Sequence, residues 1–421
     1  MPQPSNVEYY DQLDRLNFIY PYYESPFPVL INRNYSKWMI RYCYEWAIDN
    51  SGPLRKHQAF VDSIRNSDLG LYSACCFPSA NFHRLEKLMK WCTMFFLADD
   101  YHDGLSRILS NGQIDYGNFW IPMIDMFDGI LTGYQCNEWP DFIKAIQRVA
   151  KEVYFDYTKQ QINRSIKMFK DYIAGNILED NWSSEHNDGT NLTNGNGLQS
   201  ETIIPDWDSY MKARLGSVGG QMTLQLIEYA KNISLIDQEW NHPLMKSLLV
   251  AVSEEMIMVN DHLTFRKEVA EANFKFSNMR HAYTVLVHNK GLTLQEAVNH
   301  VHQLIKEKDE LIFQLIEQIM DDPILNSSSE STQRLQLYLE GVKEVLGGYW
   351  RYAIQARRYH GQNFQSQNAI PPAGHFVYDQ HQTIILMNDN NNNNNQNNNS
   401  KNKTNYNYEW LKPIPENVQP E

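Results

Sequence analysis

Apolar residues recur every three or four positions along most of this chain, which is the period of an α-helix buried on one face. Between positions 79 and 99 the recurring residues are Phe82, Leu85, Leu88, Cys92, Phe95 and, at the end, Asp99. The same period predicts further helices over 36–49, 117–133, 139–182, 206–230, 243–274, 293–321 and 330–360. Because no set of alternating strands is visible, the pattern predicts an all-α fold built as one large helical bundle.

Two polar stretches interrupt this pattern and set the expected domain limits. Residues 184–201 are rich in Asn and Gly without an apolar period, which predicts a long polar loop between two helices. Beyond residue 388 an asparagine run leads into a polar tail with little apolar surface to offset the entropy lost on ordering. We therefore expect an N-terminal segment over 1–30, one helical domain over 31–365 and a disordered tail over 366–421.

Charge and cysteine usage exclude several classes of protein. The net charge is −13, whereas binding to a nucleic-acid backbone needs clustered Lys and Arg. No apolar stretch reaches membrane-spanning length, and the first residues lack the basic and apolar regions of a secretory signal. The cysteines have no metal-binding spacing and are expected to be buried reduced thiols, namely Cys43, Cys75, Cys76, Cys92 and Cys136. We expect a cytoplasmic protein with no nucleic-acid partner and no stable membrane insertion.

The sequence Asp-Asp-Tyr-His-Asp at 99–103 places three carboxylates at the end of the helix predicted over 79–99. Asp99, Asp100 and Asp103 are close enough in sequence for all three to project from one end of the same helical face. Like charges in that arrangement repel one another, whereas Mg²⁺ ions that bridge to a phosphate would neutralise them. A solvated helix end is the alternative interpretation. The apolar run Met-Phe-Phe-Leu-Ala directly before Asp99 favours the metal site.

A second polar cluster comprises Asn260, Asp261, Thr264 and Glu268. Asn260, Thr264 and Glu268 follow an i, i+4, i+8 pattern, which lines one helical face with three oxygen donors over about 12 Å. Together these side chains can chelate one hard cation, and Lys267 beside them can reach phosphate oxygens. The same spacing also arises by chance in long helices, so a structural role stays open for this cluster taken alone.

Between the two clusters lies Arg214, whose guanidinium fork suits a diphosphate. It is followed closely by Gly216, Gly219 and Gly220. Each glycine costs a helix about 1 kcal/mol relative to alanine, so a break in the helix is predicted just beyond the arginine. An ordinary surface arginine near a glycine-tolerant helix contact is the alternative.

A second arginine that suits a diphosphate is Arg358, near the end of the last predicted helix. It is followed by Tyr359, and a guanidinium beside a phenol can bind diphosphate oxygens through N–H and O–H donors. An Arg-Tyr pair taken alone is a weak indication of function.

Together these segments resemble the class I terpene synthases of the microbial type. The resemblance rests on residues 99–103 as the aspartate-rich motif, residues 260–268 (NDHLTFRKE) as the Asn-Thr-Glu motif, Arg214 as the diphosphate sensor and Arg358-Tyr359 as the terminal pair. It spans residues 30–365. The resemblance implies a single α-helical domain around a deep active-site cavity and three Mg²⁺ ions as cofactor, and we expect either a monomer or a homodimer.

The resemblance also implies a reaction. A prenyl diphosphate, with farnesyl diphosphate as the expected substrate, would ionise to an allylic cation and diphosphate, and the cation would become a cyclic or acyclic terpene. The Mg²⁺ ligands would be Asp99, Asp100, Asp103, Asn260, Thr264 and Glu268. The diphosphate would be stabilised by Mg²⁺ and by Arg214, Lys267, Arg358 and Tyr359. The residue three positions after the sensor, acidic in many bacterial members, is Ser217 here, which leaves the link to the helix break open.

The allylic cation needs a dry pocket, and aromatic faces stabilise such a cation by about 0.5–2 kcal/mol each. Candidates for the wall lie one or two helical turns from the ligand clusters and are Trp91, Phe95, Phe96 and Trp350. Simple core packing is the alternative for each of them, because aromatic residues at helical spacing commonly face a core.

Three other functions remain open from the residues. A chain-elongating prenyl transferase shares the first motif, but it uses a second aspartate-rich motif where this chain has Asn, Thr and Glu. A metal-dependent phosphohydrolase could use His102-Asp103, although His57, His83 and His262 lack a convincing metal-binding spacing. A non-catalytic helical binding protein would leave the ordered motifs unexplained.

Overall fold

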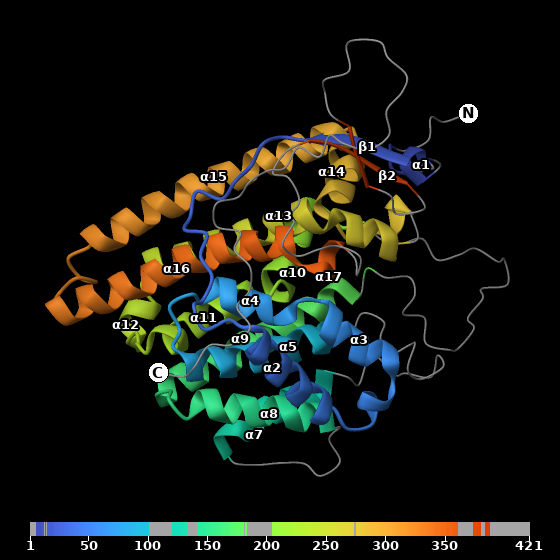
Figure 1. The fold of residues 1–421 in the computed structure, drawn as a ribbon. Helices are drawn as coiled ribbons and strands as arrows, with labels where there is room; N and C mark the ends of the chain where they lie inside the picture. Colours follow the sequence, from blue (N-terminus) through green and yellow to red (C-terminus); the bar gives the residue numbers. More distant parts are fainter. Residues whose placement is uncertain are drawn as a thin grey trace.

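The computed structural model describes residues 6–100 except 12 and 14, 120–132, 141–182 except 181, 204–272, 275–360, 374–379 and 384–387. Within them the chain forms a bundle of α-helices with one small sheet at its edge (Figure 1). The first helices are α1 (Asn6–Asp11), α2 (Lys37–Asp49), α3 (Gln58–Asn66), α4 (Leu69–Cys76), α5 (Phe82–Asp100), α7 (Trp120–Thr132), α8 (Asp141–Tyr154) and α9 (Lys159–Asp180). The later ones are α10 (Trp207–Ser217), α11 (Gly220–Lys231), α12 (Asp237–Trp240), α13 (Pro243–Glu271), α14 (Ala282–Lys290), α15 (Leu294–Asp321), α16 (Ser329–Gln355) and α17 (Arg357–His360). The predicted all-α bundle is confirmed.

Helix α13 lies at the centre of the bundle (Figure 1). It contacts α10, α11, α14, α15, α16 and α17. Its four consecutive residues from Met256 to Val259 are all buried, because neighbouring helices cover it on every face. Any polar side chain on this helix is therefore held in a defined place by the helices around it.

Several helices begin where the sequence contains capping residues. The Thr293 side chain accepts a hydrogen bond from the Glu296 N–H, and the Thr293 N–H donates to Glu296 Oε2 at 2.8 Å, which completes a capping box at the start of α15. Asp206 accepts a hydrogen bond from the Ser209 N–H at 2.9 Å and starts α10. These local signals place the helix starts correctly.

Two of the predicted helical segments are interrupted. The break predicted after Arg214 is confirmed, because α10 ends at Ser217 and Gly219 adopts a φ of +71°, a conformation that favours glycine. The segment predicted over 139–182 is two helices, α8 and α9. Between them the Thr158 N–H donates to Gln161 Oε1 at 2.8 Å and caps the start of α9. In the sequence this capping pair is a weaker signal than the apolar period, which continues through it.

Helices α3, α4 and α14 were not predicted from the apolar period. In α4 every residue from Leu69 to Cys76 is buried, and in α14 the residues from Ala282 to Val287 are buried as well. A helix that is covered all round has no polar face, so its sequence shows no alternation between apolar and polar positions.

A three-stranded antiparallel sheet joins the two ends of the chain. Strand β1 (Arg15–Tyr20) pairs with β2 (Gly374–Asp379), which pairs with β3 (Ile384–Met387). The structure therefore places two ordered strands within the tail over 366–421 that was expected to be disordered. Their sequences, GHFVYD and IILM, are short runs rich in β-branched and aromatic residues, too brief to stand out inside a polar tail. The expected polar loop over 184–201 lies outside the described residues.

The described cysteines behave as the sequence predicts. Cys43, Cys75, Cys76 and Cys92 are buried and form no disulfide with one another, whereas Cys136 lies outside the described residues. Burial raises the pKa of the Cys75 thiol to about 11 and that of Cys92 to about 12, so both stay protonated near neutral pH.

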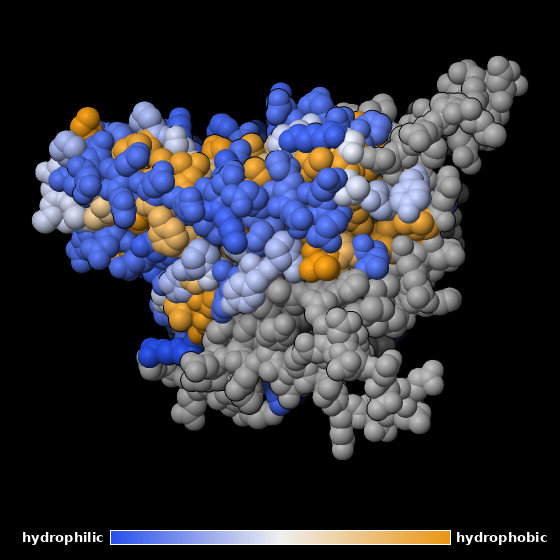
Figure 2. All heavy atoms as spheres, turned by 90° about the horizontal axis from the view of Figure 1, so that it is seen from above, coloured by the Kyte–Doolittle hydropathy of each residue, from blue (hydrophilic) through white to orange (hydrophobic). Residues whose placement is uncertain are grey.

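The face of the bundle seen in Figure 2 is mainly hydrophilic, with smaller hydrophobic areas between the polar side chains. On α15, which runs along the top of Figure 1, Leu311 and Phe313 are exposed, while Ile305 and Ile312 are fully buried. Helix α15 is thus an amphipathic surface helix that covers α13. Among the helices of the described ranges, none has the length and apolar character needed to cross a membrane.

Candidate active site

Two carboxylates lie at the C-terminal end of α5, directly after its buried residues. Leu97 and Ala98 are fully buried, and the next two residues, Asp99 and Asp100, have side chains that are 31% and 20% exposed. The Tyr172 hydroxyl on α9 donates to Asp99 Oδ1 at 3.0 Å. Two members of the predicted acidic cluster therefore lie together above a buried helix, and the third, Asp103, is outside the described residues.

Arg358, at the start of the short helix α17, holds both of these carboxylates. Its Nη1 donates to the two oxygens of Asp100 at 2.5 and 2.6 Å, and its Nη2 donates to Asp99 at 3.3 Å. The guanidinium also lies 5.0 Å from the centre of the Phe96 ring. Burial lowers the pKa of Arg358, but Asp100 and other nearby groups outweigh it and hold the pKa well above its ordinary value, so Arg358 is always charged.

The neighbour of this arginine, Tyr359, links it to α13. Tyr359 is buried, and burial raises the pKa of its hydroxyl, while the charges of Arg358 and Lys267 lower it. Lys267 on α13 is thus close enough to act electrostatically on Tyr359. The predicted terminal pair and the predicted lysine lie on the same side of the bundle.

The second predicted cluster lies along α13. The Thr264 hydroxyl donates to Glu268 Oε1 at 2.8 Å, one turn further along the helix. Asn260, one turn before Thr264, accepts a hydrogen bond from Arg214 through Oδ1 at 3.0 Å. Burial raises the pKa of Glu268. Asn260, Thr264 and Glu268 therefore share one face of α13, as their spacing predicts. Arg214 contacts the first of them, Asn260.

Arg214 on α10 is surrounded by acceptors from three helices. Its Nη2 donates to Asn260 and, at 3.4 Å, to Asp261 Oδ1, both on α13. Its Nη1 lies 3.4 Å from Ser217 Oγ on its own helix and 3.6 Å from Glu179 Oε1 on α9. Burial lowers the pKa of Arg214, but Glu179 and the other anionic neighbours outweigh it, so the pKa lies well above its ordinary value.

Asp261 has a structural role that its spacing does not reveal. Its side chain is completely buried and accepts hydrogen bonds from the Tyr210 hydroxyl and, at 3.0 Å, from the Ala282 N–H. Its backbone oxygen lies 2.7 Å from His281 Nε2, while the other ring nitrogen of His281 accepts from the Tyr283 N–H at 3.0 Å. Asp261 thereby ties α10, α13 and α14 together beneath the oxygen donors.

The side chains of Asp261, Glu268 and His281 also place one potential metal-ligand atom each within 4.8 Å of one another. Both ring nitrogens of His281 and the carboxylate of Asp261 already have hydrogen-bond partners within the protein. We therefore interpret Asp261 and His281 as the support of the site, and Glu268 as the member of this group that can turn to a cation.

The two oxygen-donor clusters are joined by α9 and α16. On α9, Tyr172 bonds to Asp99 and Glu179 approaches Arg214, and seven residues of helix separate these contacts by roughly 10 Å along the axis. On α16, Tyr349 is close enough to both Asn260 and Tyr359 for each of them to affect the pKa of its hydroxyl, which burial raises. Both clusters therefore belong to one site.

The four predicted wall residues fall into different surroundings. Trp91 and Phe95 are buried and pack on Phe169 of α9, with ring centres 5.4 and 4.7 Å apart. Phe96 is half-buried and lies beside Arg358. Trp350 on α16 is 1% exposed. Phe96 thus contacts a residue of the charged site directly.

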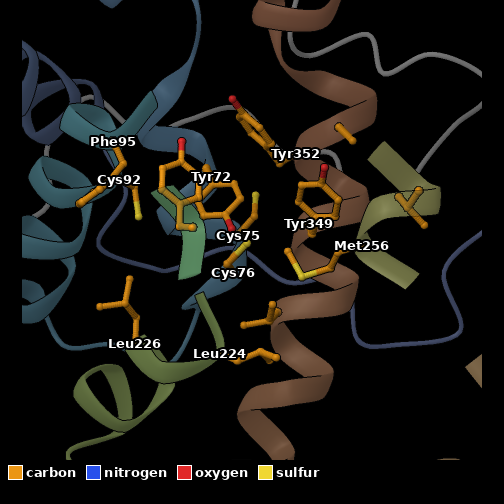
Figure 3. Packing of buried hydrophobic residues seen from close by; sticks show 14 of the residues in the cluster. Tyr72, Cys75, Cys76, Cys92, Phe95, Leu224, Leu226, Met256, Tyr349 and Tyr352 are labelled. Atoms are coloured by element: carbon orange, nitrogen blue, oxygen red, sulfur yellow. The ribbon is translucent and has the colours of Figure 1, made fainter. Parts of the chain in front are cut away.

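Further aromatic residues lie next to Phe96 and were not predicted. Tyr72 on α4 packs against Phe96 and Tyr352, with ring centres 5.2 and 5.3 Å apart, and its ring lies 6.1 Å from that of Tyr349. Figure 3 shows Tyr72, Tyr349 and Tyr352 together with Met256 and Leu224, contributed by α4, α16, α13 and α11. This apolar region borders the charged site.

Sequence reasoning also missed Tyr172, Glu179, Tyr210 and His281. The two tyrosines occupy positions that fit the apolar period of their helices, so nothing in the local pattern marks their hydroxyls. Glu179 and His281 lie far in sequence from the residues they contact. Only the fold brings them to the site.

Comparison with known proteins agrees with this geometry. A family model described as terpene synthase family 2, C-terminal metal binding, matches residues 90–308. The matched range contains Asp99, Asp100, Arg214 and the oxygen donors of α13, and it ends before Arg358.

Individual proteins are similar over most of the chain. Germacrene A synthase of Nostoc punctiforme is 24% identical over 80% of this chain and 93% of its own length. The 4-epi-cubebol synthase ((2E,6E)-farnesyl diphosphate cyclizing) of Streptosporangium roseum is 20% identical over 79% of this chain and 90% of its own. The solved structure of a-eudesmol synthase has a TM-score of 0.63 at 16% identity and covers 79% of this chain and 98% of its own, which shows a common fold.

Proposed function

Because the chain belongs to the terpene synthase family 2, C-terminal metal-binding family, we propose that it ionises a prenyl diphosphate and converts the allylic cation into a terpene. The observation that carries this proposal is that each cluster of metal-ligand oxygens contacts an arginine. Arg358 of α17 contacts the cluster at the end of α5, and Arg214 of α10 contacts the cluster on α13. Cation ligands and diphosphate-binding groups thus lie together. We propose farnesyl diphosphate as the substrate, since the similar protein from Streptosporangium roseum is named for cyclising it.

We assign the cofactor as three Mg²⁺ ions. The proposed ligands are Asp99, Asp100 and Asp103 on one side and Asn260, Thr264 and Glu268 on the other. Carboxylate, amide and hydroxyl oxygens fit a hard divalent cation, and the partial exposure of Asp99 and Asp100 lets a hydrated ion approach. When bound, the ions would supply Lewis-acid stabilisation of the departing diphosphate.

The basic residues of the site would act on the leaving group. As the allylic carbon–oxygen bond breaks, its electron pair departs with the diphosphate, and negative charge grows on the diphosphate oxygens. We propose that Arg214, Lys267, Arg358 and Tyr359 donate hydrogen bonds to these oxygens. A single donor aimed at developing charge contributes about 10²- to 10³-fold to the rate of such a step.

The cation that remains would be held among apolar and aromatic side chains. We propose Trp91, Phe95, Phe96 and Trp350 as substrate contacts, and we add Tyr72, Tyr349 and Tyr352 from the region beside Phe96. Phe96 supports this placement because its ring faces the guanidinium of Arg358, next to which the allylic carbon would be released. The cation would then lose a proton to give a hydrocarbon, or add water and release a proton to give an alcohol.

We propose that the protein acts in the cytoplasm as a monomer or a homodimer. The buried thiols of Cys43, Cys75, Cys76 and Cys92, which form no disulfide among the described residues, support a reducing compartment. Size-exclusion chromatography with light scattering distinguishes the two oligomeric states.

The reaction is tested by incubating the protein and Mg²⁺ with geranyl, farnesyl or geranylgeranyl diphosphate and analysing the products by gas chromatography with mass spectrometry. We expect a fifteen-carbon hydrocarbon or alcohol from farnesyl diphosphate, and no product when Mg²⁺ is chelated. Asp99→Ala and Asn260→Ala should lose most activity while remaining folded. Glu330→Gln, at a side chain that is 88% exposed on α16, is the control and should retain activity.

Two outcomes would contradict the proposal. A longer prenyl diphosphate formed when isopentenyl diphosphate is added would identify a chain-elongating transferase. Faster turnover of a nucleotide or simple phosphate ester than of any prenyl diphosphate would identify a phosphohydrolase.

A further inference from the structure

Helices α9 and α10 touch through two glycines, and this contact places a carboxylate beside Arg214. A Cβ atom added at Gly175 would lie 2.5 Å from the Ser217 nitrogen and 2.8 Å from the Ala213 oxygen, and one added at Gly216 would lie 2.7 Å from the Asp171 oxygen. Only glycine allows backbones to approach this closely. The side chain one turn beyond Gly175 on α9 is therefore directed to the end of α10.

That side chain is Glu179. It is 13% exposed, accepts a hydrogen bond from the Ser217 hydroxyl and lies 3.6 Å from Arg214 Nη1. Ser217 carries no charge, so the anionic partner of Arg214 at this end of α10 comes from α9. A largely buried carboxylate in contact with an arginine and a hydroxyl is an ordered group, because each contact restricts its position.

The contact lies where the helix breaks. Ser217 is the last residue of α10, Gly219 has a φ of +71°, and a Cβ at Gly220 would lie 3.1 Å from Ser253 Oγ on α13. Glu179 thus bonds to the residue that ends α10, immediately before the turn that leads the chain onto α13.

The two nitrogens of the Arg214 fork have separate partners. Nη1 faces Glu179 and Ser217, and Nη2 faces Asn260 and Asp261. In the proposed function Asn260 becomes a metal ligand, so its oxygen turns from the guanidinium to a cation. Nη1 would then keep both of its partners, and Nη2 would keep only its 3.4 Å contact with Asp261. Nη2 and the buried Nε, which has no hydrogen-bond partner among the described residues, could donate to a diphosphate.

We propose that Glu179 is a positioning residue that acts through Ser217 and Nη1 of Arg214 to hold the guanidinium in place while Nη2 transfers from Asn260 to the diphosphate. The inference rests on the proposed function, because it assigns Arg214 to the diphosphate. Without the carboxylate, the guanidinium could follow Asn260 and Asp261, and its N–H groups would no longer be directed at the leaving group.

The test moves the negative charge beside Arg214 from position 179 to position 217. Glu179→Gln removes the charge, Ser217→Asp adds one, and the double variant Glu179→Gln/Ser217→Asp restores a single carboxylate beside Nη1. Asp171→Asn is the matched control, since it makes the same charge change on α9 at an exposed pair with Lys167. For each protein, kcat and KM for terpene formation, the affinity for inorganic diphosphate with Mg²⁺ by calorimetry, and the melting temperature are measured.

We expect Glu179→Gln to lower kcat and the affinity for inorganic diphosphate by about 10- to 100-fold, as loss of a supporting partner does at metal sites. The double variant should recover most of both, Ser217→Asp alone should be impaired by the two adjacent carboxylates, and Asp171→Asn should behave as the wild type.

Wild-type kcat and diphosphate affinity in Glu179→Gln would overturn the inference. A double variant that regains the wild-type melting temperature but stays inactive would also overturn it, because Glu179 would then only hold the helices together. A wild-type protein that forms no terpene from any prenyl diphosphate would instead reject the proposed function, and the diphosphate affinities of the variants would still report on Arg214.

Discussion

The guanidinium of Arg358 donates to both carboxylate oxygens of Asp100. A residue proposed to bind diphosphate is thus paired with a residue proposed to bind Mg²⁺. One charged nitrogen, Nη1, donates to both oxygens, and a charged donor on a charged acceptor makes a strong contact. When a cation and a diphosphate bind together, the cation takes the place of Arg358 at Asp100 and the diphosphate takes the place of Asp100 at Arg358. Binding of only one of them leaves either Arg358 or Asp100 without a partner. The site is therefore expected to bind the two in a cooperative manner.

Removing this arginine should change the two affinities in opposite directions. In Arg358→Ala, Asp99 and Asp100 lose their competing cation, so Mg²⁺ alone should bind more tightly, while diphosphate should bind more weakly and kcat should fall by about 10²- to 10³-fold. Arg358→Lys should not restore activity, because a single ammonium nitrogen cannot replace the two guanidinium nitrogens that reach Asp100 and Asp99 separately. Calorimetric titration with Mg²⁺ and with diphosphate measures both effects.

Arg65→Ala is the control for this substitution. It removes an arginine from an exposed ion pair with Glu45, and such pairs contribute about 0–1 kcal/mol to stability. Weaker Mg²⁺ binding in Arg358→Ala would show that the arginine does not compete with the metal for Asp100.

The hydroxyl of Thr264 should matter more than its methyl group. Thr264→Ser retains the donor to Glu268 and should keep the wild-type dependence on Mg²⁺, whereas Thr264→Ala removes a proposed ligand and should raise the Mg²⁺ concentration for half-maximal rate by about tenfold or more. Initial rates measured over a Mg²⁺ titration test this. The same Mg²⁺ dependence in Thr264→Ala would remove this residue from the ligand set.

The sequence predicts this part of the site well because its signals are local. Asn260, Thr264 and Glu268 lie on one helix, so their spacing alone determines that they share a face. Glu179 and Tyr172 could not be found in this way, since their contacts depend on how α9 crosses α10 and on where it passes α5. That crossing is set by the close approach of Gly175 and Gly216, which no periodicity reveals.

A buried acid pair outside the proposed site should make stability depend on pH. The Tyr23 hydroxyl lies 3.4 Å from Glu255 Oε1 on α13 and 3.2 Å from Asp309 Oδ2 on α15. One hydroxyl donates to one of them at a time. Burial raises the pKa of Asp309 to about 7, compared with an ordinary value of 3.8, and burial together with the charge of Asp309 raises the pKa of Glu255 well above its usual range.

The sign of the effect follows from proton binding. Between pH 4 and pH 7 the folded protein keeps the proton on Asp309 while the unfolded chain has lost it, so the contribution of this group to stability falls as pH rises through that window. Asp309→Asn cannot ionise and should lose this dependence. The melting temperature of the variant minus that of the wild type should therefore be larger at pH 8 than at pH 5.

Thermal melts of the wild type and Asp309→Asn at both pH values provide the measurement. Glu307→Gln on the exposed side of α15 is the control and should follow the wild type. A constant difference between Asp309→Asn and the wild type at the two pH values would show that the carboxyl group does not retain its proton in the folded protein.

Helices α4 and α16 are predicted to tolerate no side chain at their crossing. A Cβ at Gly348 would overlap the backbone of Cys75 and lie 2.7 Å from the Cys76 nitrogen. Gly348→Ala should lower the free energy of unfolding by about 1–3 kcal/mol or more, although alanine is the better helix former by about 1 kcal/mol. Chemical denaturation measures this loss.

The matched substitution is Gly341→Ala on the same helix, where the added atom would meet side-chain atoms of Ile227 and Lys231 and no backbone atom among its three nearest neighbours. It should cost less than Gly348→Ala. Equal stability of Gly348→Ala and the wild type would show that α4 and α16 can separate slightly without loss.

Long helices with one polar face were predictable from the sequence, whereas the short helix α3 and the helices that are covered on all sides were not. Helix α15 shows both a capping box and a clear apolar stripe, and its limits follow from the sequence. Helix α4 is buried at every position. Strand β2 pairs with β1, which lies more than 350 residues earlier in the chain, and β3 pairs with β2. Contacts of that kind are set by the tertiary structure, not by local sequence.

The central claim is that α5 and α13 together bind the metal ions that hold the diphosphate. The most direct measurement is a crystal structure grown with inorganic diphosphate and Mn²⁺ in place of Mg²⁺, in which anomalous scattering locates the ions. We predict metal density bound by Asp99 or Asp100 on one side and by Asn260, Thr264 and Glu268 on the other, with the diphosphate between them in contact with Arg214 and Arg358. Ions located away from both clusters, with Arg358 still paired to Asp100, would contradict the account.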